Sequence, residues 1–181
     1  MFLNEPYFAN QVVVRRLDGE PPLDFDCGRV AQNQFLYNSA ARDQGEWISC
    51  TYLHFLRGIC VAYATVCMDS LPLGTREKPR SIRYKYIGAL KLAQLGVDRR
   101  VQGRGLAREV IADVVALAQD AAVRIGCRYV SIDAQPDLVG WYERHGFVVN
   151  KLHQKEKLAA AGGTIDPAHM TVSMRLDLRD V

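Results

Sequence analysis

The segment Asp98–Ala107 combines three arginines with two closely spaced glycines, Gly103 and Gly105. It follows alternating apolar residues that end at Val97, and it precedes a segment of helical periodicity. A turn from a strand into a helix presents unpaired backbone N–H groups and the positive helix end to one point. The segment is therefore a candidate binding turn for a phosphate or pyrophosphate group.

Two common nucleotide-binding motifs do not fit this turn. The Gly-Lys-Ser/Thr ending of the nucleotide-binding P-loop is missing. The three-glycine dinucleotide motif is also missing, and Asp120 lies in the middle of the expected helix instead of at a strand end. Two glycines alone leave open a second interpretation, in which the turn is solvent-exposed and uses glycine only for its geometry.

The remaining periodicities predict an α/β (α+β) fold, with a mixed sheet of about seven strands flanked by helices. The clearest helix is Gly105–Ile125, and Arg57-Gly58 is expected to join two strands as a hairpin. The other expected segments are strands at Gln11–Leu17, Ile48–Leu56, Ile59–Met68, Tyr84–Val97, Tyr129–Ala134, Phe147–Leu152 and Met170–Leu178, helices at Arg29–Gln44 and from Pro136 to Gly146, and loops at Asp69–Lys78 and His153–His169.

The composition is that of a globular domain, with 49% hydrophobic and 24% charged residues among 181. It argues against disorder, a coiled coil and a membrane span, and one domain over residues 1–181 is expected. The five cysteines have neither zinc-site nor disulfide-framework spacing, so we expect reduced thiols in a cytoplasmic protein without a secretory signal. The net charge of +3 is compatible with an anionic ligand or RNA and is evidence for neither.

Three consecutive motifs resemble the GNAT superfamily of acetyltransferases. Gln102–Ala107 is similar to its acetyl-CoA pyrophosphate loop, Q/R-x-x-G-x-G/A, and Leu95–Val97 to its splayed fourth strand. Trp141–Phe147 resembles its F-Y-E-x-x-G-F segment. The resemblance implies a GNAT fold and acetyl-CoA as cosubstrate. The residues it implies for coenzyme binding are Leu95, Gly96, Val97, Gln102, Gly103, Arg104, Gly105, Leu106 and Ala107.

A narrower resemblance points to the acetyltransferase toxins of bacterial type II toxin–antitoxin systems. Phe25–Gly28, followed by Phe35-Leu36, is similar to their F-x-C-G turn and the helix after it, and Ile132–Ala134 to the end of their fifth strand. Gly96 and Gln94 depart from the usual alanine and arginine, and the loop after His153 is longer. The resemblance implies acetylation of aminoacyl-tRNA and a ribbon-helix-helix antitoxin as partner. A homodimer is a candidate assembly that the sequence does not decide.

Tyr142 is the catalytic candidate that the GNAT resemblance implies. A phenol is also chemically suited to protonate a departing thiolate of similar basicity. Trp141 and Phe147 are expected to pack in the core, and His145 is expected on an exposed face and not as a base.

The fourth strand, Lys91–Val97, contains no carboxylate. A lysine side chain has a pKa of about 10.4 and needs a base, whereas an α-amino group of pKa about 7.7–8.0 is partly neutral already. The absence favours an α-amine acceptor. A base supplied by Glu46, or by Asp133 through a water, is the alternative.

Basic residues lie in two groups. Arg99, Arg100 and Arg104 flank the glycine turn and are explained most simply by coenzyme phosphates. The group between Arg76 and Lys85 either follows an RNA backbone or is a solvated loop. No histidine or cysteine spacing predicts a metal site, so none is expected.

Two other functions remain open at this point. One is a stand-alone GNAT enzyme that acetylates a small-molecule amine or a protein N-terminus. The other is a non-catalytic acetyl-CoA-binding sensor.

Overall fold

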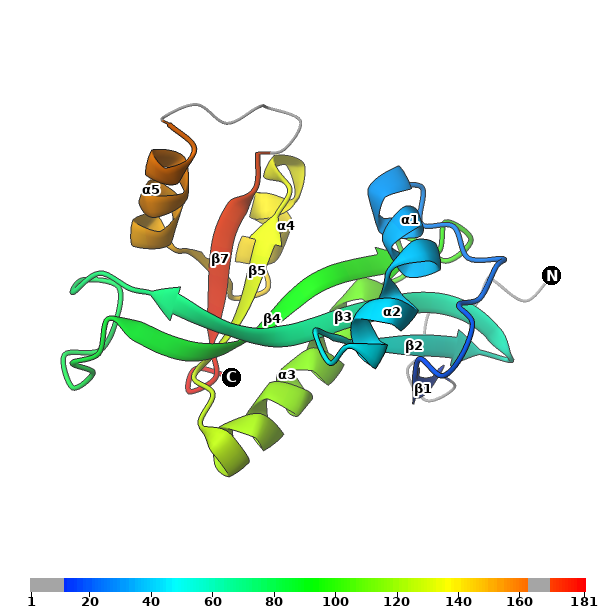
Figure 1. Ribbon diagram of the computed structural model, residues 1–181, viewed down its shortest axis with the longest axis horizontal. Coiled ribbons are helices and arrows are strands. Elements are labelled where there is room, and N and C mark those ends of the chain that lie inside the picture. Colours follow the sequence, from blue (N-terminus) through cyan, green and yellow to red (C-terminus); the bar gives the residue numbers. More distant parts are fainter. Residues whose placement is uncertain (1–11, 163–169) are drawn as a thin grey trace. The chain divides into compact units, whose positions relative to one another are not determined.

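The computed structural model describes residues 12–162 and 170–181. Its elements are β1 (Val12–Arg16), α1 (Val30–Asn38), α2 (Ala40–Gly45), β2 (Cys50–Leu56), β3 (Ile59–Pro72), β4 (Tyr86–Val97), α3 (Leu106–Ile125), β5 (Tyr129–Ala134), the 3-10 helix η2 (Pro136–Leu138), α4 (Val139–Glu143), β6 (Val148–Val149), α5 (Lys151–Ala160) and β7 (Val172–Asp177) (Figure 1).

The strands form one mixed seven-stranded sheet in the order β1-β2-β3-β4-β5-β7-β6. The predicted α/β class and strand number are confirmed. The chain divides into two compact units, Met1–Cys67 with Leu92–Val114 and Met68–Lys91 with Val115–Val181. The single domain expected over residues 1–181 stays a prediction.

The first unit contains the predicted hairpin. β2 pairs antiparallel with β3, and the two residues between them, Arg57 and Gly58, have φ values of 51° and 83°. Positive φ at both positions is what a two-residue type I′ hairpin turn requires. β1 pairs antiparallel with β2 and lies beside it in Figure 1. The part of the expected strand at Gln11 lies outside the described residues.

The single helix expected at Arg29–Gln44 is two helices. Ser39 has φ −124° and ψ −34°, so α1 ends there and α2 begins immediately afterwards. Leu36 and Ala40, one on each side of the break, are both fully buried in the same core cluster. The other buried members of that cluster are Leu17, Phe25, Cys27, Leu53, Cys60 and Tyr63.

The second unit contains β5 paired antiparallel with β7, which in turn pairs with the short strand β6. The expected strand Phe147–Leu152 is therefore mostly wrong, because only Val148 and Val149 are extended. β3 continues through Pro72 into the expected loop, and β7 is shorter than predicted. A second core cluster contains Leu71, Leu73, Ala89 and Tyr129.

Helix α5 replaces the first part of the loop expected at His153–His169, and residues 163–169 of that loop lie outside the described residues. Its N-cap, Asn150, makes no side-chain capping bond. The carboxylate of Glu77, far away in the sequence, instead accepts hydrogen bonds from the amides of Lys151 (2.7 Å) and Leu152 (3.1 Å). Capping from another segment leaves no local sequence signal, which explains why the sequence pattern does not predict this helix.

Within the described ranges, no helix is both long and apolar enough to cross a bilayer. The five cysteines are all free thiols, and Cys27, Cys60 and Cys127 are buried. No group of three metal-ligating side chains gathers in the part of the chain that the structure describes.

Candidate acetyl-CoA-binding turn and catalytic residues

The turn between β4 and α3 has the backbone geometry that its glycines suggested. Gly103 and Gly105 have φ values of 76° and 84°, a conformation that residues with a Cβ rarely adopt. Both glycines face open space, since a Cβ added to either of them would meet no atom within 4 Å. Because α3 begins at Leu106, its first amides have no acceptor within the helix. The turn therefore leaves room and N–H donors for an anion.

A buried carboxylate, that of Asp98, organises the start of this turn. Its Oδ1 accepts hydrogen bonds from the Arg100 amide (2.9 Å) and Nε (2.7 Å), and its Oδ2 from Arg100 Nη2 (2.9 Å) and the Asp26 amide (3.0 Å). Burial tends to raise the pKa of Asp98, but the bonds from Arg100 and the Asp26 amide outweigh it and the pKa lies below its usual range. Asp98 is therefore an ionised structural anchor.

The turn Phe25–Gly28 is the second partner of Asp98. The Asp26 carboxylate accepts from the Gly28 amide (2.7 Å) and from Asn33 Nδ2 (2.7 Å), and these bonds lower its pKa. The Arg99 amide donates to the Asp26 carbonyl (2.9 Å). The segment that resembles the toxins' F-x-C-G turn therefore supports the glycine turn directly.

Cys27 is not a reactive thiol. Burial raises the pKa of its thiol, and its Sγ lies 3.1 Å from Asn33 Oδ1 as a donor. A nucleophilic role would require the opposite shift.

The polar residues of the glycine turn differ in what they already contact. Gln102 Nε2 donates to the carbonyls of Cys27 (2.9 Å) and Val97 (2.8 Å), so its side chain ties the turn to β4. Arg99 pairs with Asp26 at 3.1 Å, and Arg100 is held by Asp98. We expected both arginines to contact the coenzyme phosphates. The ion pair with Asp98 instead explains the position of Arg100, and the ion pair with Asp26 explains part of that of Arg99. Among the described residues, Arg104 forms no ion pair.

The departure from alanine at Gly96 has a steric cause. A Cβ at this position would lie 2.5 Å from Tyr63 Cε1 and 3.1 Å from Phe25 Cζ. The two rings meet edge to face with centroids 5.4 Å apart, and the Tyr63 hydroxyl donates to the Gln32 carbonyl (2.8 Å). Tyr63 is fully buried, so its ring cannot retreat.

Tyr142, in the second unit, is buried at the end of α4. Its ring packs edge to face against Trp141 and Phe147, with centroid distances of 4.9 and 5.5 Å. Phe147 is buried as expected, whereas Trp141 is half-buried. His145 is half-buried and not exposed, because it stacks on Trp141 and its Nδ1 lies 2.8 Å from the Trp141 carbonyl. The packing holds the Tyr142 ring in one orientation.

Asp133, at the end of β5, is occupied by two lysines. Lys91 Nζ lies 2.6 Å from its Oδ2 and Lys157 Nζ 2.8 Å from its Oδ1. Burial tends to raise the pKa of Asp133, but the two ammonium groups outweigh it and the pKa lies below its usual range. A carboxylate that holds its proton so weakly is a poor general base at neutral pH.

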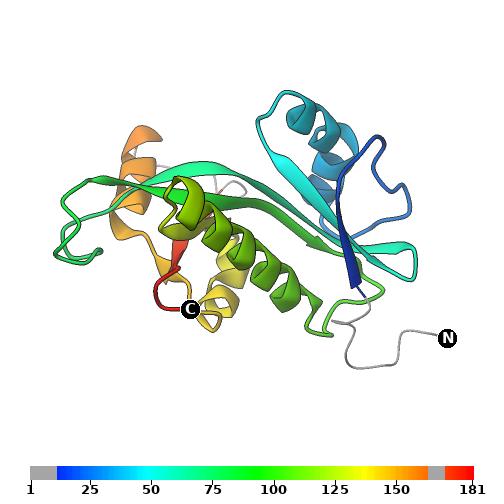
Figure 2. The same cartoon turned by 90° about the horizontal axis from the view of Figure 1, so that it is seen from below.

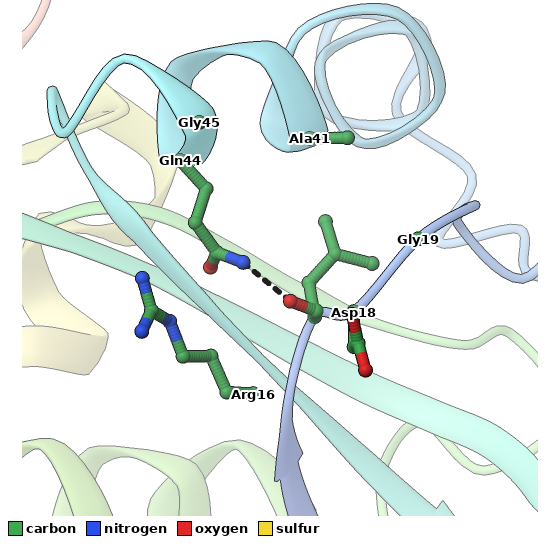
Figure 3. A pocket seen from close by; sticks show the side chains of 7 residues that line it. Arg16, Asp18, Gly19, Ala41, Gln44 and Gly45 are labelled. Atoms are coloured by element: carbon green, nitrogen blue, oxygen red, sulfur yellow. Dashed lines mark hydrogen bonds between the residues drawn. The ribbon is translucent and has the colours of Figure 1, made fainter.

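A surface pocket lies elsewhere in the first unit, where Gln44 joins α2 to the residues after β1 (Figure 3). Gln44 Nε2 donates to the Leu17 carbonyl, and its Oε1 accepts from the Thr51 amide (3.0 Å). None of the coenzyme candidates lines this pocket. Its lining residues are Arg16, Leu17, Asp18, Gly19, Ala41, Gln44 and Gly45.

Sequence reasoning missed Asp98 and Asp26 as functional supports. Asp26 was visible within the Phe25–Gly28 motif, but its contact with a turn 72 residues later follows only from the fold. Asp98 carried one weak signal, since it is the first residue after the strand.

Comparison with known proteins identifies the fold. Residues 81–160 match the family model of the acetyltransferase (GNAT) domain. A bacterial toxin of known structure is 21% identical over 93% of this chain and 92% of its own, with a TM-score of 0.77. AtaT complexed with acetyl-methionyl-tRNAfMet is 20% identical over 93% of this chain and 96% of its own, with a TM-score of 0.76. A tyrosine-to-phenylalanine mutant of KacT is 19% identical over 94% of this chain and 96% of its own, with a TM-score of 0.74.

The predicted resemblance to GNAT acetyltransferases is thus confirmed over residues 81–160, and the prediction of an acyltransferase is confirmed. The fold of the chain is shared with acetyltransferase toxins of toxin–antitoxin systems, which confirms the narrower resemblance at the level of the fold.

The packing around Gly96 predicts that Gly96→Ala destabilises the protein by about 1–3 kcal/mol, the usual cost of overpacking a core. In a Tyr63→Leu background the same change should cost clearly less, because the clashing ring is gone. Denaturant unfolding of the four proteins in this double-mutant cycle measures the coupling. Additive effects of the two changes would contradict the steric explanation.

Proposed function

We propose that this acyltransferase transfers the acetyl group of acetyl-CoA to the α-amino group of an aminoacyl-tRNA and thereby blocks translation as a toxin. The observation that carries the proposal is the open, amide-rich glycine turn, held by the Phe25–Gly28 segment that resembles the toxins. The similarity of the fold to AtaT, whose complex with acetyl-methionyl-tRNAfMet is known, supports the choice of acceptor.

The coenzyme pyrophosphate is assigned to the amides from Gly103 to Ala107. Two left-handed glycines and the start of α3 support this assignment, as does Arg104, whose side chain forms no ion pair with the other described residues. The backbone of Leu95–Val97 is assigned to the thioester carbonyl and the pantetheine arm. Gln102 contributes by fixing the turn against Val97 rather than by donating its amide to the phosphates.

The proposed reaction needs one proton donor and little help from a base. The neutral α-amine attacks the thioester carbonyl, and the tetrahedral intermediate collapses with loss of the coenzyme thiolate. Tyr142 donates its phenolic proton to that thiolate, the nitrogen loses its extra proton to water, and the Tyr142 phenolate then regains a proton from water. The fourth strand offers no carboxylate, and the lowered pKa of Asp133 argues against Asp133 as an alternative base.

Two further parts of the proposal concern partners. AtaT is known bound to the C-terminus of the antitoxin AtaR, and the KacTA complex is known bound to DNA. By analogy we assign this chain an antitoxin partner, and the ribbon-helix-helix class of that partner, a cytoplasmic location and a homodimer stay predictions. The basic residues between Arg76 and Lys85 are assigned to the RNA backbone.

The coenzyme assignment predicts opposite outcomes for two substitutions of nearly equal size. Gly105→Asp places a negative charge where the pyrophosphate must approach, so acetyl-CoA affinity should fall more than about tenfold. Gly105→Asn tolerates the same left-handed backbone without the charge, and its affinity should fall much less. Calorimetric titration measures both, and a matched thermal unfolding midpoint confirms that both fold. Equal affinities for the two variants would rule out the pyrophosphate at this turn.

Tyr142→Phe should keep acetyl-CoA affinity and lower turnover by roughly 10²- to 10⁴-fold, because only the proton donor is removed. The phenyl ring preserves the contacts with Trp141 and Phe147. Steady-state kinetics with saturating coenzyme give the comparison. Turnover within about twofold of wild type would make Tyr142 a packing residue.

The acceptor assignment predicts that expression of the chain alone arrests bacterial growth and that labelled acetyl groups appear on charged tRNA. Uncharged tRNA should stay unlabelled, since it has no α-amine. Expression of Tyr142→Phe should be much less toxic. Label transfer to free amines or protein N-termini alone, with normal growth, would instead support the stand-alone enzyme, and coenzyme binding without any transfer would support a sensor.

A further inference from the structure

The loop between β3 and β4, Leu73–Lys85, exposes an aromatic ring among cations. Tyr84 is 78% exposed, and no ring or cation contact covers it within the described residues. Arg76, Arg80 and Arg83 are also exposed and form no ion pair in the described part of the chain. Figure 2 shows this loop extending beyond the ends of the two strands that it joins.

The single acid of the loop is turned inward. Glu77 caps α5 through the amides of Lys151 and Leu152, and its Oε2 also accepts from the Gly74 amide (3.0 Å). Arg175, itself 8% exposed, donates to the Glu77 carbonyl at 2.6 Å. Because these groups satisfy Glu77, no acid of the loop itself offsets the positive charge of the exposed Arg76, Arg80 and Arg83.

Three further bonds hold the two limbs of the loop in place. Lys78 Nζ donates to the Tyr84 carbonyl, and the Leu73 amide donates to the Lys85 carbonyl (3.0 Å). Lys85 Nζ pairs with Glu156 of α5 at 3.0 Å. The backbone of Tyr84 is thereby fixed while its ring stays in solvent, so a ligand that contacts the ring does not have to order the loop first.

Unpaired nucleotides match this surface better than a duplex does. A base stacks on an exposed aromatic ring only when it is not already stacked and paired in a helix, while arginines beside the ring contact the phosphates. Tyr86 is less suited, because Lys85 Nζ lies 5.2 Å from the centroid of its ring. Tyr84 is therefore the stacking candidate and Tyr86 its internal comparison.

We propose that the loop Leu73–Lys85 binds unpaired nucleotides of RNA, with one base stacked on Tyr84 and the adjacent phosphates contacted by Arg80 and Arg83. The proposal rests on the proposed function for its choice of RNA as the polymer. It adds a preference for single-stranded RNA and a residue that provides this preference.

The test measures fluorescence anisotropy of a labelled single-stranded RNA of about ten nucleotides and of the same sequence as a duplex, with the full chain and without acetyl-CoA. Tyr84→Ala should weaken single-strand binding by roughly 5- to 150-fold and leave duplex binding unchanged. Tyr84→Phe should restore binding, and Tyr86→Ala should have a smaller effect. Arg83→Ala should reduce the salt slope by about 0.7. Thermal unfolding should not change, because the Tyr84 side chain is exposed.

Equal losses for single strand and duplex, or none for either, would overturn the stacking role of Tyr84. Absence of RNA binding by the wild-type chain would overturn the whole loop proposal. A second measurement, of acetyl transfer to charged tRNA and to a small aminoacyl ester, distinguishes failure of the loop proposal from failure of the proposed function. Tyr84→Ala should raise KM for charged tRNA and leave transfer to the ester unchanged. If neither acceptor is acetylated by the wild type, the proposed function fails, while the anisotropy result still decides the loop.

Discussion

The carboxylate of Asp98 connects two turns that are 72 residues apart in the sequence, and the geometry of the glycine turn depends on it. It is 2% exposed, and four donors from Arg100 and Asp26 surround it. Hydrogen bonds to a charged group contribute roughly 1.5–3 kcal/mol each, and a buried donor left without its acceptor costs a similar amount. The Phe25–Gly28 segment is thus a structural part of the glycine turn.

The basic residues of the chain divide by what already neutralises them. Arg99 and Arg100 lie next to the glycine turn, but acids of the first unit hold them, which leaves the backbone amides and Arg104 as the main donors to an anion. Arg80 and Arg83 lie on a loop whose one acid is used elsewhere. The net charge of +3 does not distinguish these two groups of arginines, because it counts paired and unpaired cations alike.

Local patterns were sufficient for most of the fold. The period of α3, the alternation of β7 and the hairpin at Arg57-Gly58 each follow from neighbouring residues, and the structure contains all three. The predictions from the sequence fail where residues distant in the sequence determine the local structure. Helix α5 was not predicted because Glu77, a distant residue, caps it. The break between α1 and α2 at Ser39 was not predicted because no proline or glycine marks it, and Leu36 and Ala40 on its two sides pack into one core cluster. The same holds for the candidate site, where the motif glycines were evident and the support from Asp26 was not.

The contact between Gly96 and Tyr63 also constrains the order in which sequences of this kind can change. An ancestor with alanine on the fourth strand could accept a large ring at position 63 only after that alanine had become glycine. The reverse path keeps full stability only if the ring is lost first, since the Cβ of an alanine at position 96 would lie 2.5 Å from Tyr63 Cε1. The two positions are therefore coupled, and the glycine is explained by the packing of an aromatic core residue rather than by the chemistry of acetyl transfer.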